Sequence, residues 1–108
     1  MTTEDAESNV TVVLQESESR FAILVGEEMA GLAEFRAAPG MRAFTHTEVS
    51  EAHQGQGLAK RLVSAALNET RKEGLSVLPY CPMVRALIAK NSEYLDLVPE
   101  ARRAEFGL

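Results

Sequence analysis

Residues 44–60 read FTHTEVSEAHQGQGLAK, and the character of the chain changes within this stretch. Before Ser50 the stretch contains Phe44, Thr45, Thr47 and Val49, residue types that favour a pleated, half-buried strand. After it, Gly55 and Gly57 precede a helical pattern of apolar residues that begins at Leu58, and Gly74 can end that helix in a left-handed conformation. The short apolar run 75–78 that follows predicts a buried strand. A strand, a glycine turn, a helix and a strand in this order predict a parallel crossover.

The segments on either side of this unit predict an antiparallel meander and a second helix. Alternating apolar residues mark strands over Val10–Leu14 and Phe21–Val25. Residue types that favour a pleated surface mark a further strand over Arg42–Val49. The Ala-rich segment Met29–Arg36 fits either a strand or a helix. Pro82 fits the first position of a further helix, and the residues beyond Pro99 form a short helix or a tail. We therefore expect an α/β (α+β) fold with a mixed, mostly antiparallel sheet and a terminal helix that covers the candidate ligand site.

Length and composition limit the classes of function. The 108 residues fit one domain, which we expect over residues 10–98, between a disordered N-terminal tail (1–9) and a C-terminal tail or short helix (99–108). A net charge of −5 argues against nucleic acid and anionic membranes as partners. No apolar run approaches the ~20 residues of a membrane span, and the acidic start does not resemble a signal peptide, so we expect a cytoplasmic protein. A single Cys excludes an internal disulfide, and with only two His we expect no metal site.

The loop Gln54–Ala59 is the best candidate for a ligand site. Glycines allow backbone amides to approach a ligand closely, and the start of a helix offers unsatisfied N–H groups and the positive end of its dipole, which together suit a pyrophosphate. Lys60 and Arg61 would add positive charge. The alternative is that the two glycines simply form a tight turn, since a short glycine motif alone is weak evidence.

The context of this loop resembles the Gcn5-related N-acetyltransferase (GNAT) superfamily, whose signature [QR]-x-x-G-x-[GA] is matched by Gln54, Gly57 and Ala59. Three further motifs, in the same order, resemble a small, minimal acetyltransferase-like family over roughly residues 10–98: HTEV (46–49), C-P-x-V (81–84) and N-x-E-Y (91–94). The resemblance implies a fourth strand that splays from the fifth, and acetyl-CoA as cosubstrate inserted between them. The cofactor-binding residues that it implies are Val49, Gln54, Gly55, Gln56, Gly57, Leu58, Ala59, Lys60 and Asn91.

Three residues are candidates for catalysis. Cys81 precedes Pro82 at a predicted helix start, where a thiolate is stabilised, although a lone cysteine is also commonly a buried small hydrophobe. The resemblance implies a place near the thioester, where Cys81 would act either as the proton donor to the departing CoA thiolate or as a transient acetyl carrier. His46 and Glu48 share one face of a strand and can form a base with its orienting carboxylate, or merely a polar surface pair. His53 lies in the loop, where it can be solvated.

The resemblance therefore implies acetyl transfer from acetyl-CoA to an amine-bearing small molecule or protein, and we expect a monomer or weak homodimer. The alternatives are a CoA-binding module without catalysis and a thiol-based redox or interaction domain.

Overall fold

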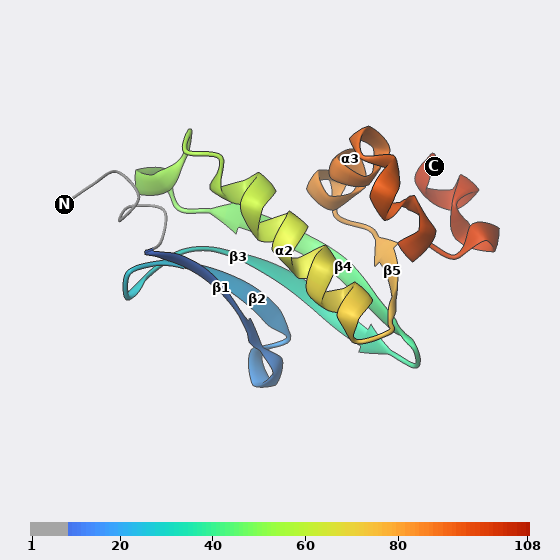
Figure 1. The fold of residues 1–108 in the computed structure, drawn as a ribbon, viewed down its shortest axis with the longest axis horizontal. Helices are drawn as coiled ribbons and strands as arrows, with labels where there is room; N and C mark the ends of the chain where they lie inside the picture. Colours follow the sequence, from blue (N-terminus) through green and yellow to red (C-terminus); the bar gives the residue numbers. More distant parts are fainter. Residues whose placement is uncertain (1–8) are drawn as a thin grey trace.

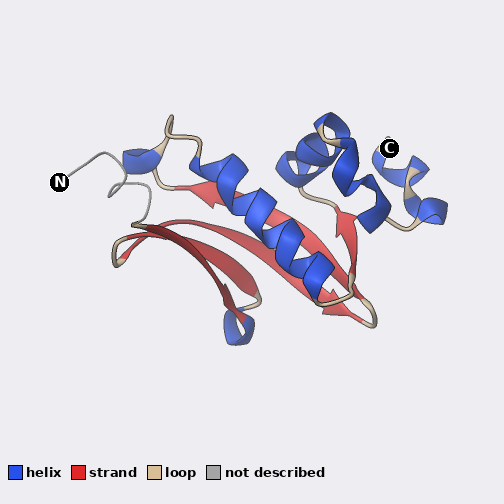
Figure 2. Ribbon diagram, viewed as in Figure 1, coloured by secondary structure: helices blue, strands red, loops and turns tan. Residues whose placement is uncertain are grey.

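The computed structural model describes residues 9–108, so the predicted N-terminal tail lies, apart from Asn9, outside the described residues. The described chain forms a five-stranded sheet in the order β1-β2-β3-β4-β5. The strands are β1 (Val10–Gln15), β2 (Arg20–Val25), β3 (Glu28–Ala38), β4 (Met41–Val49) and β5 (Ser76–Pro79). β1 to β4 are antiparallel neighbours, and β4 pairs with β5 in parallel. Helix α2 (Leu58–Lys72) crosses one face of the sheet, and helix α3 (Pro82–Lys90) follows β5 (Figures 1 and 2). The expected meander and parallel crossover are confirmed.

The ambiguous segment Met29–Arg36 is part of the long strand β3. Its alternation decides the matter, because Ala33 and Phe35 are buried while Glu34 and Arg36 are exposed. Its neighbours β2 and β4 pair with it along both edges. The helical preference of its alanines is therefore overridden by sheet pairing and by burial of one face.

A β-bulge interrupts the pairing of β3 with β4. Phe35 pairs with Phe44 and Glu34 pairs with His46, so Thr45 has no partner. One extra residue reverses the alternation of side chains along a strand. Before Thr45, the even-numbered residues of β4 therefore face α2. After Thr45, the odd-numbered residues face it.

Helix α2 covers the sheet with one apolar stripe. Its buried residues Leu58, Leu62, Val63, Ala66 and Leu67 pack into one core with the aromatic rings of β2, β3 and β4. The rings of Phe21, Phe35 and Phe44 lie 5.6 to 6.1 Å apart at their centroids. Directly paired residues of neighbouring strands lie on the same face of a sheet. A strand residue that pairs with a member of this core therefore lies on the face that α2 covers.

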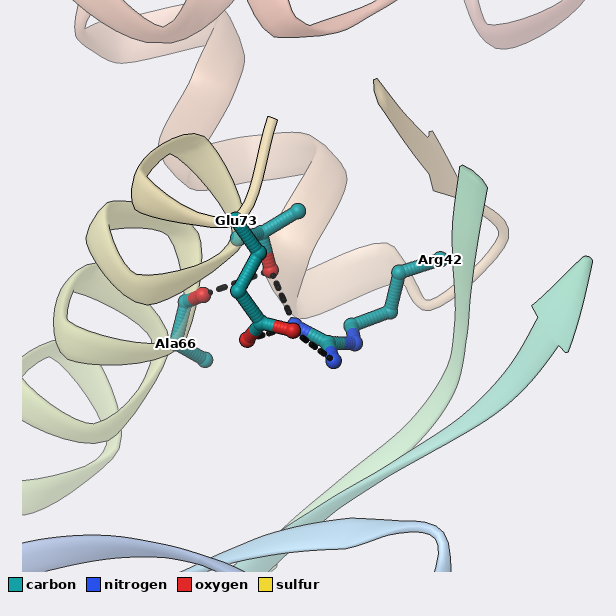
Figure 3. A network of polar contacts seen from close by, with 4 residues as sticks. Arg42, Ala66 and Glu73 are labelled. Carbon is teal, nitrogen blue, oxygen red and sulfur yellow. Dashed lines mark hydrogen bonds and ion pairs between the residues drawn. The ribbon is translucent and has the colours of Figure 1, made fainter. Parts of the chain in front are cut away.

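A buried arginine within this core was not singled out by the sequence patterns. The Arg42 guanidinium lies over the rings of Phe21 and Phe35, and it donates hydrogen bonds to Thr70 and Glu73 near the end of α2 (Figure 3). Thr70 in turn donates to the Ala66 carbonyl at 2.8 Å. This network ties β4 to the end of α2, just before the chain enters β5.

The residues after α3 form three short 3₁₀ turns, η3 (Ser92–Leu97), η4 (Glu100–Arg102) and η5 (Ala104–Phe106). Phe106 is buried and packs edge-on against Tyr80. Residues 99–108 thus contain the two short turns η4 and η5.

Candidate functional site

A cavity of about 350 Å³ lies where β4 continues beyond its parallel partner. β5 pairs with β4 only from Met41 to Phe44, so residues 45–49 have no β5 neighbour. In a strand without a neighbour, alternate backbone N–H and C=O groups stay available to a ligand. The cavity joins this strand end to the glycine loop and the start of α2, and its lining residues are Thr47, Glu48, Val49, His53, Gln54, Gly55, Gly57, Leu58, Ala59 and Met83.

The start of α2 has backbone amides that no side chain caps. The first intrahelical bond runs from the Arg61 N–H to the Gly57 carbonyl, so the amides of the three preceding residues have no acceptor within the helix. Gly55 and Gly57 have φ of +82° and +72°, and a Cβ at either position would meet nothing within 4 Å. The helix start thus carries amide donors without helical acceptors and the positive end of the dipole, next to two glycines that leave open space around them.

Most of the predicted cofactor residues line this cavity, two line only its neighbour, and Gln56 lines neither. Gln54 donates from Nε2 to the Val49 carbonyl at 3.2 Å, which ties the loop to the strand end. Gln56 is exposed and does not line the cavity. Lys60 and Asn91 line a second cavity of about 400 Å³ between α2 and α3, which shares Ala59 and Met83 with the first. Asn91 also closes α3, since its side chain donates to the Leu87 carbonyl at 3.0 Å.

Cys81 lies at the N-terminus of α3, directly before Pro82 at the first helical position, as predicted. It is 3% exposed and does not line the cavity. Its N–H donates to the Phe44 carbonyl at 2.9 Å, and its thiol donates to the hydroxyl of Thr47 with Sγ and Oγ1 3.4 Å apart. The residue that reaches the cavity is therefore Thr47, which the sequence reasoning did not select.

His46 and Glu48 form the expected pair on one face, with Nε2 and Oε1 2.8 Å apart. Their side chains are 53% and 61% exposed. Thr47 pairs with the buried Ala33 and so faces α2, which places the His46 and Glu48 side chains on the opposite face of β4 from Cys81. The structure thus does not bring the three predicted catalytic side chains together on one face.

His53 was expected to be free for solvation in its loop, but its side chain is only 12% exposed and it lines the cavity. Its Nδ1 lies 2.8 Å from the Ser50 hydroxyl, and its Nε2 lies 3.9 Å from a carboxylate oxygen of Glu28. These contacts connect the loop to the start of β3. The only sequence signal for this position was its place directly before Gln54.

Within residues 9–108, no three His, Cys, Asp or Glu side chains are grouped as metal ligands. No helix in the same range is long and apolar enough to cross a membrane.

Two solved structures show the same fold. The chain is similar to a candidate GCN5-like N-acetyltransferase from Staphylococcus aureus, with a TM-score of 0.64 and 23% identity over 85% of this chain and 90% of the other. It is also similar to the ribosomal-protein-S18-alanine N-acetyltransferase from Escherichia coli, with a TM-score of 0.56 and 18% identity over 83% of this chain and 72% of the other. No protein of curated function matches the chain.

Residues 20–97 match the family described as GCN5-related N-acetyl-transferase. The match covers most of the sheet, both long helices and the cavity described above. The resemblance expected from the sequence motifs is thereby confirmed for the family, while the roles of the individual motif residues remain predictions. The chain belongs to the GCN5-related N-acetyltransferase family.

Proposed function

We propose that this protein binds acetyl-CoA in the cavity beside β4 and transfers the acetyl group to an amine. One observation carries the proposal: a single cavity joins the end of β4, where the strand has no neighbour on its β5 side, to an uncapped helix N-terminus. A pyrophosphate suits the amides of Leu58 to Lys60, and the amide-containing pantetheine arm suits the free backbone of residues 45–49. Acetyl-CoA supplies the activated acetyl group as a thioester.

The chain's own residues divide the remaining work. Lys60 and Lys90, on the rim of the adjoining cavity, add positive charge for the outer phosphates. His46 accepts a proton from the attacking amine while Glu48 orients its imidazole. Because β5 does not cover residues 45–49, groups from both faces of β4 reach its free edge. The acceptor thus approaches from the open face that carries His46, opposite to the face covered by α2.

The acceptor class follows from charge. The net charge of −5 and the exposed carboxylate of Glu48 favour a cationic amine over an anionic or neutral acceptor. We propose a small amine or an amino group of a protein.

A CoA-binding module without turnover is the second candidate. The observation that favours it is the burial of Cys81, whose thiol does not line the cavity. Binding is common to both candidates, so only turnover separates them.

The test begins with binding. CoA at one hundred times its dissociation constant should stabilise the folded protein by ~2.7 kcal/mol, seen as a rise in the melting temperature. Absence of any shift with CoA and acetyl-CoA contradicts both candidates.

Turnover is then followed as CoA release with a panel of amines and peptides. His46→Gln should lower kcat about 10²-fold or more, as expected for a lost general base. Arg36→Gln, an exposed change on the same face but nearer the β3–β4 turn, should leave kcat unchanged.

A further inference from the structure

We infer that Thr47 is a further functional residue of this site, whose hydroxyl connects the buried thiol of Cys81 to the cavity and relays a proton from Sγ to a leaving thiolate. The inference rests on the proposed acetyl transfer and assigns its leaving-group step.

The position of the thiol is set by the backbone. The Cys81 N–H is held by the Phe44 carbonyl at 2.9 Å, and Pro82 fixes the direction in which α3 leaves. The sulfur is thus held against β4, where Sγ lies 3.4 Å from its hydrogen-bond acceptor, Thr47 Oγ1. Cys81 is 3% exposed and absent from the cavity wall, whereas Thr47 forms part of that wall. Any proton exchange between Cys81 and a bound ligand therefore has its shortest polar route through the threonine hydroxyl.

The bulge at Thr45 creates this arrangement. Phe44 faces α2, so strict alternation along β4 would turn His46 and Glu48 to the same face and Thr47 away from it. The unpaired Thr45 reverses the order, and the pairing of Thr47 with Ala33 places its side chain on the α2 face beside Cys81. The same reversal moves His46 to the open face. One extra residue thus separates the proposed acceptor side of the strand from the proposed leaving-group side.

A threonine hydroxyl can accept one hydrogen bond and donate another at the same time. It accepts one hydrogen bond from the thiol and keeps its own hydrogen to donate into the cavity. When the thioester C–S bond breaks, its electron pair stays on the CoA sulfur. Thr47 donates its hydroxyl proton to the CoA sulfur and accepts the thiol proton of Cys81. The net change is that CoA leaves as a thiol and Cys81 becomes a thiolate. The proton taken from the amine by His46 returns through solvent to Cys81 after release of the products, which balances the cycle.

The first measurement needs no ligand. Because the chain contains one cysteine, its Raman spectrum has a single S–H stretching band, which lies at lower wavenumber when the S–H group donates a hydrogen bond. Thr47→Val keeps the shape of the side chain and removes the acceptor, so the band should move to higher wavenumber. Thr47→Ser should keep the band of the unaltered protein. Thr45→Val is the matched control, since that hydroxyl contacts the Glu34 carbonyl instead. A band that does not move in Thr47→Val overturns the inference.

The second measurement is turnover of acetyl-CoA with a cationic amine that the panel of amines and peptides identifies as an acceptor. Thr47→Val should lower kcat about tenfold to a hundredfold, with KM and the dissociation constant of CoA changed less than about twofold, since a proton relay acts only in the transition state. Thr47→Ser should restore most of kcat, and Thr47→Val combined with Cys81→Ala should be no slower than Cys81→Ala alone. Unchanged kcat in Thr47→Val overturns the relay. Absence of CoA binding or turnover in the unaltered protein instead contradicts the proposed function.

Discussion

The Arg42 guanidinium is held by the carboxylate of Glu73 through two hydrogen bonds of 3.1 and 3.2 Å. Arg42 belongs to β4, and Glu73 follows the last residue of α2. A third bond of 3.0 Å runs to Thr70 (Figure 3). The guanidinium carbon Cζ lies 4.5 Å from the ring centroid of Phe35. The pair fixes where α2 ends relative to the sheet, and hence where its N-terminus meets the cavity at the other end.

Removing the Glu73 carboxylate should lower the free energy of unfolding more than removing the Arg42 guanidinium. Glu73→Ala leaves a nearly buried guanidinium without its counter-charge, and we expect a loss of about 2 kcal/mol in the free energy of unfolding, moderated by the partial exposure of Glu73. Arg42→Met keeps the apolar contacts with the two rings and should cost less. Lys72→Ala, an exposed change next to Glu73, should stay within about 0.5 kcal/mol. Urea unfolding at pH 7 measures all three, and equal losses for Glu73→Ala and Lys72→Ala would refute the role of the pair.

A second ion pair connects α2 to η3 and makes stability depend on pH. Arg71 donates to both carboxylate oxygens of Asp96, at 2.8 and 3.1 Å, and to the Glu93 carbonyl at 2.7 Å. The hydrogen bonds from Arg71 lower the pKa of the Asp96 carboxyl below its ordinary value. A lowered folded-state pKa contributes stability that is present above the unfolded-state value, near 3.8, and is lost as the pH falls through the folded-state value.

Asp96→Asn should therefore destabilise the protein at pH 7 and lose this effect in acid. We expect the difference in urea midpoint between Asp96→Asn and the unaltered protein to shrink toward zero as the pH falls from 5 to 2.5. A difference that stays constant over this range would show that the carboxylate charge is not responsible.

Gly31 keeps the cavity wall in place. A Cβ at this position would lie 2.7 Å from the Glu48 carbonyl oxygen and 3.2 Å from Val49, both backbone or branched groups that cannot move aside cheaply. Gly31→Ala should therefore displace the end of β4 and weaken CoA binding at least about tenfold, or ~1.4 kcal/mol. Isothermal titration measures the affinity, and far-UV circular dichroism checks that the sheet is retained. Unaltered affinity in a folded Gly31→Ala protein would mean that β4 can shift without affecting the site.

Alanine substitutions at Gly57 and Gly40 separate the effect of backbone strain from the effect of a Cβ that blocks the approach of a ligand. Gly57 and Gly40 have nearly the same φ, +72° and +71°, so alanine at either should cost about 1 kcal/mol of folding stability. Gly40 lies in the turn between β3 and β4, outside the cavity, whereas Gly57 borders the amides at the start of α2. We expect only Gly57→Ala to weaken CoA binding, because its Cβ would occupy space that a phosphate needs. The same affinity in both variants would locate the pyrophosphate elsewhere.

Local patterns along the chain were sufficient for the fold class. The strand, glycine turn and helix around residues 44–60 and the proline at the start of α3 depend on backbone freedom and on the periodicity of apolar residues, which are properties of neighbouring residues. The same patterns predicted that His46 and Glu48 share a face and that Cys81 precedes a helix, and both are confirmed.

Contacts between distant segments decided the rest. Met29–Arg36 is a strand because β2 and β4 pair with it, and no local pattern could choose between strand and helix. The bulge at Thr45 arises from the register of two strands, so the periodicity of β4 alone could not show that Thr47 would face Cys81 while His46 faced away. Arg42 reads as an ordinary strand residue until Glu73, 31 positions later, is folded against it. Side-chain alternation is a property of one strand, but the choice of which face meets a partner requires the partner to be in place.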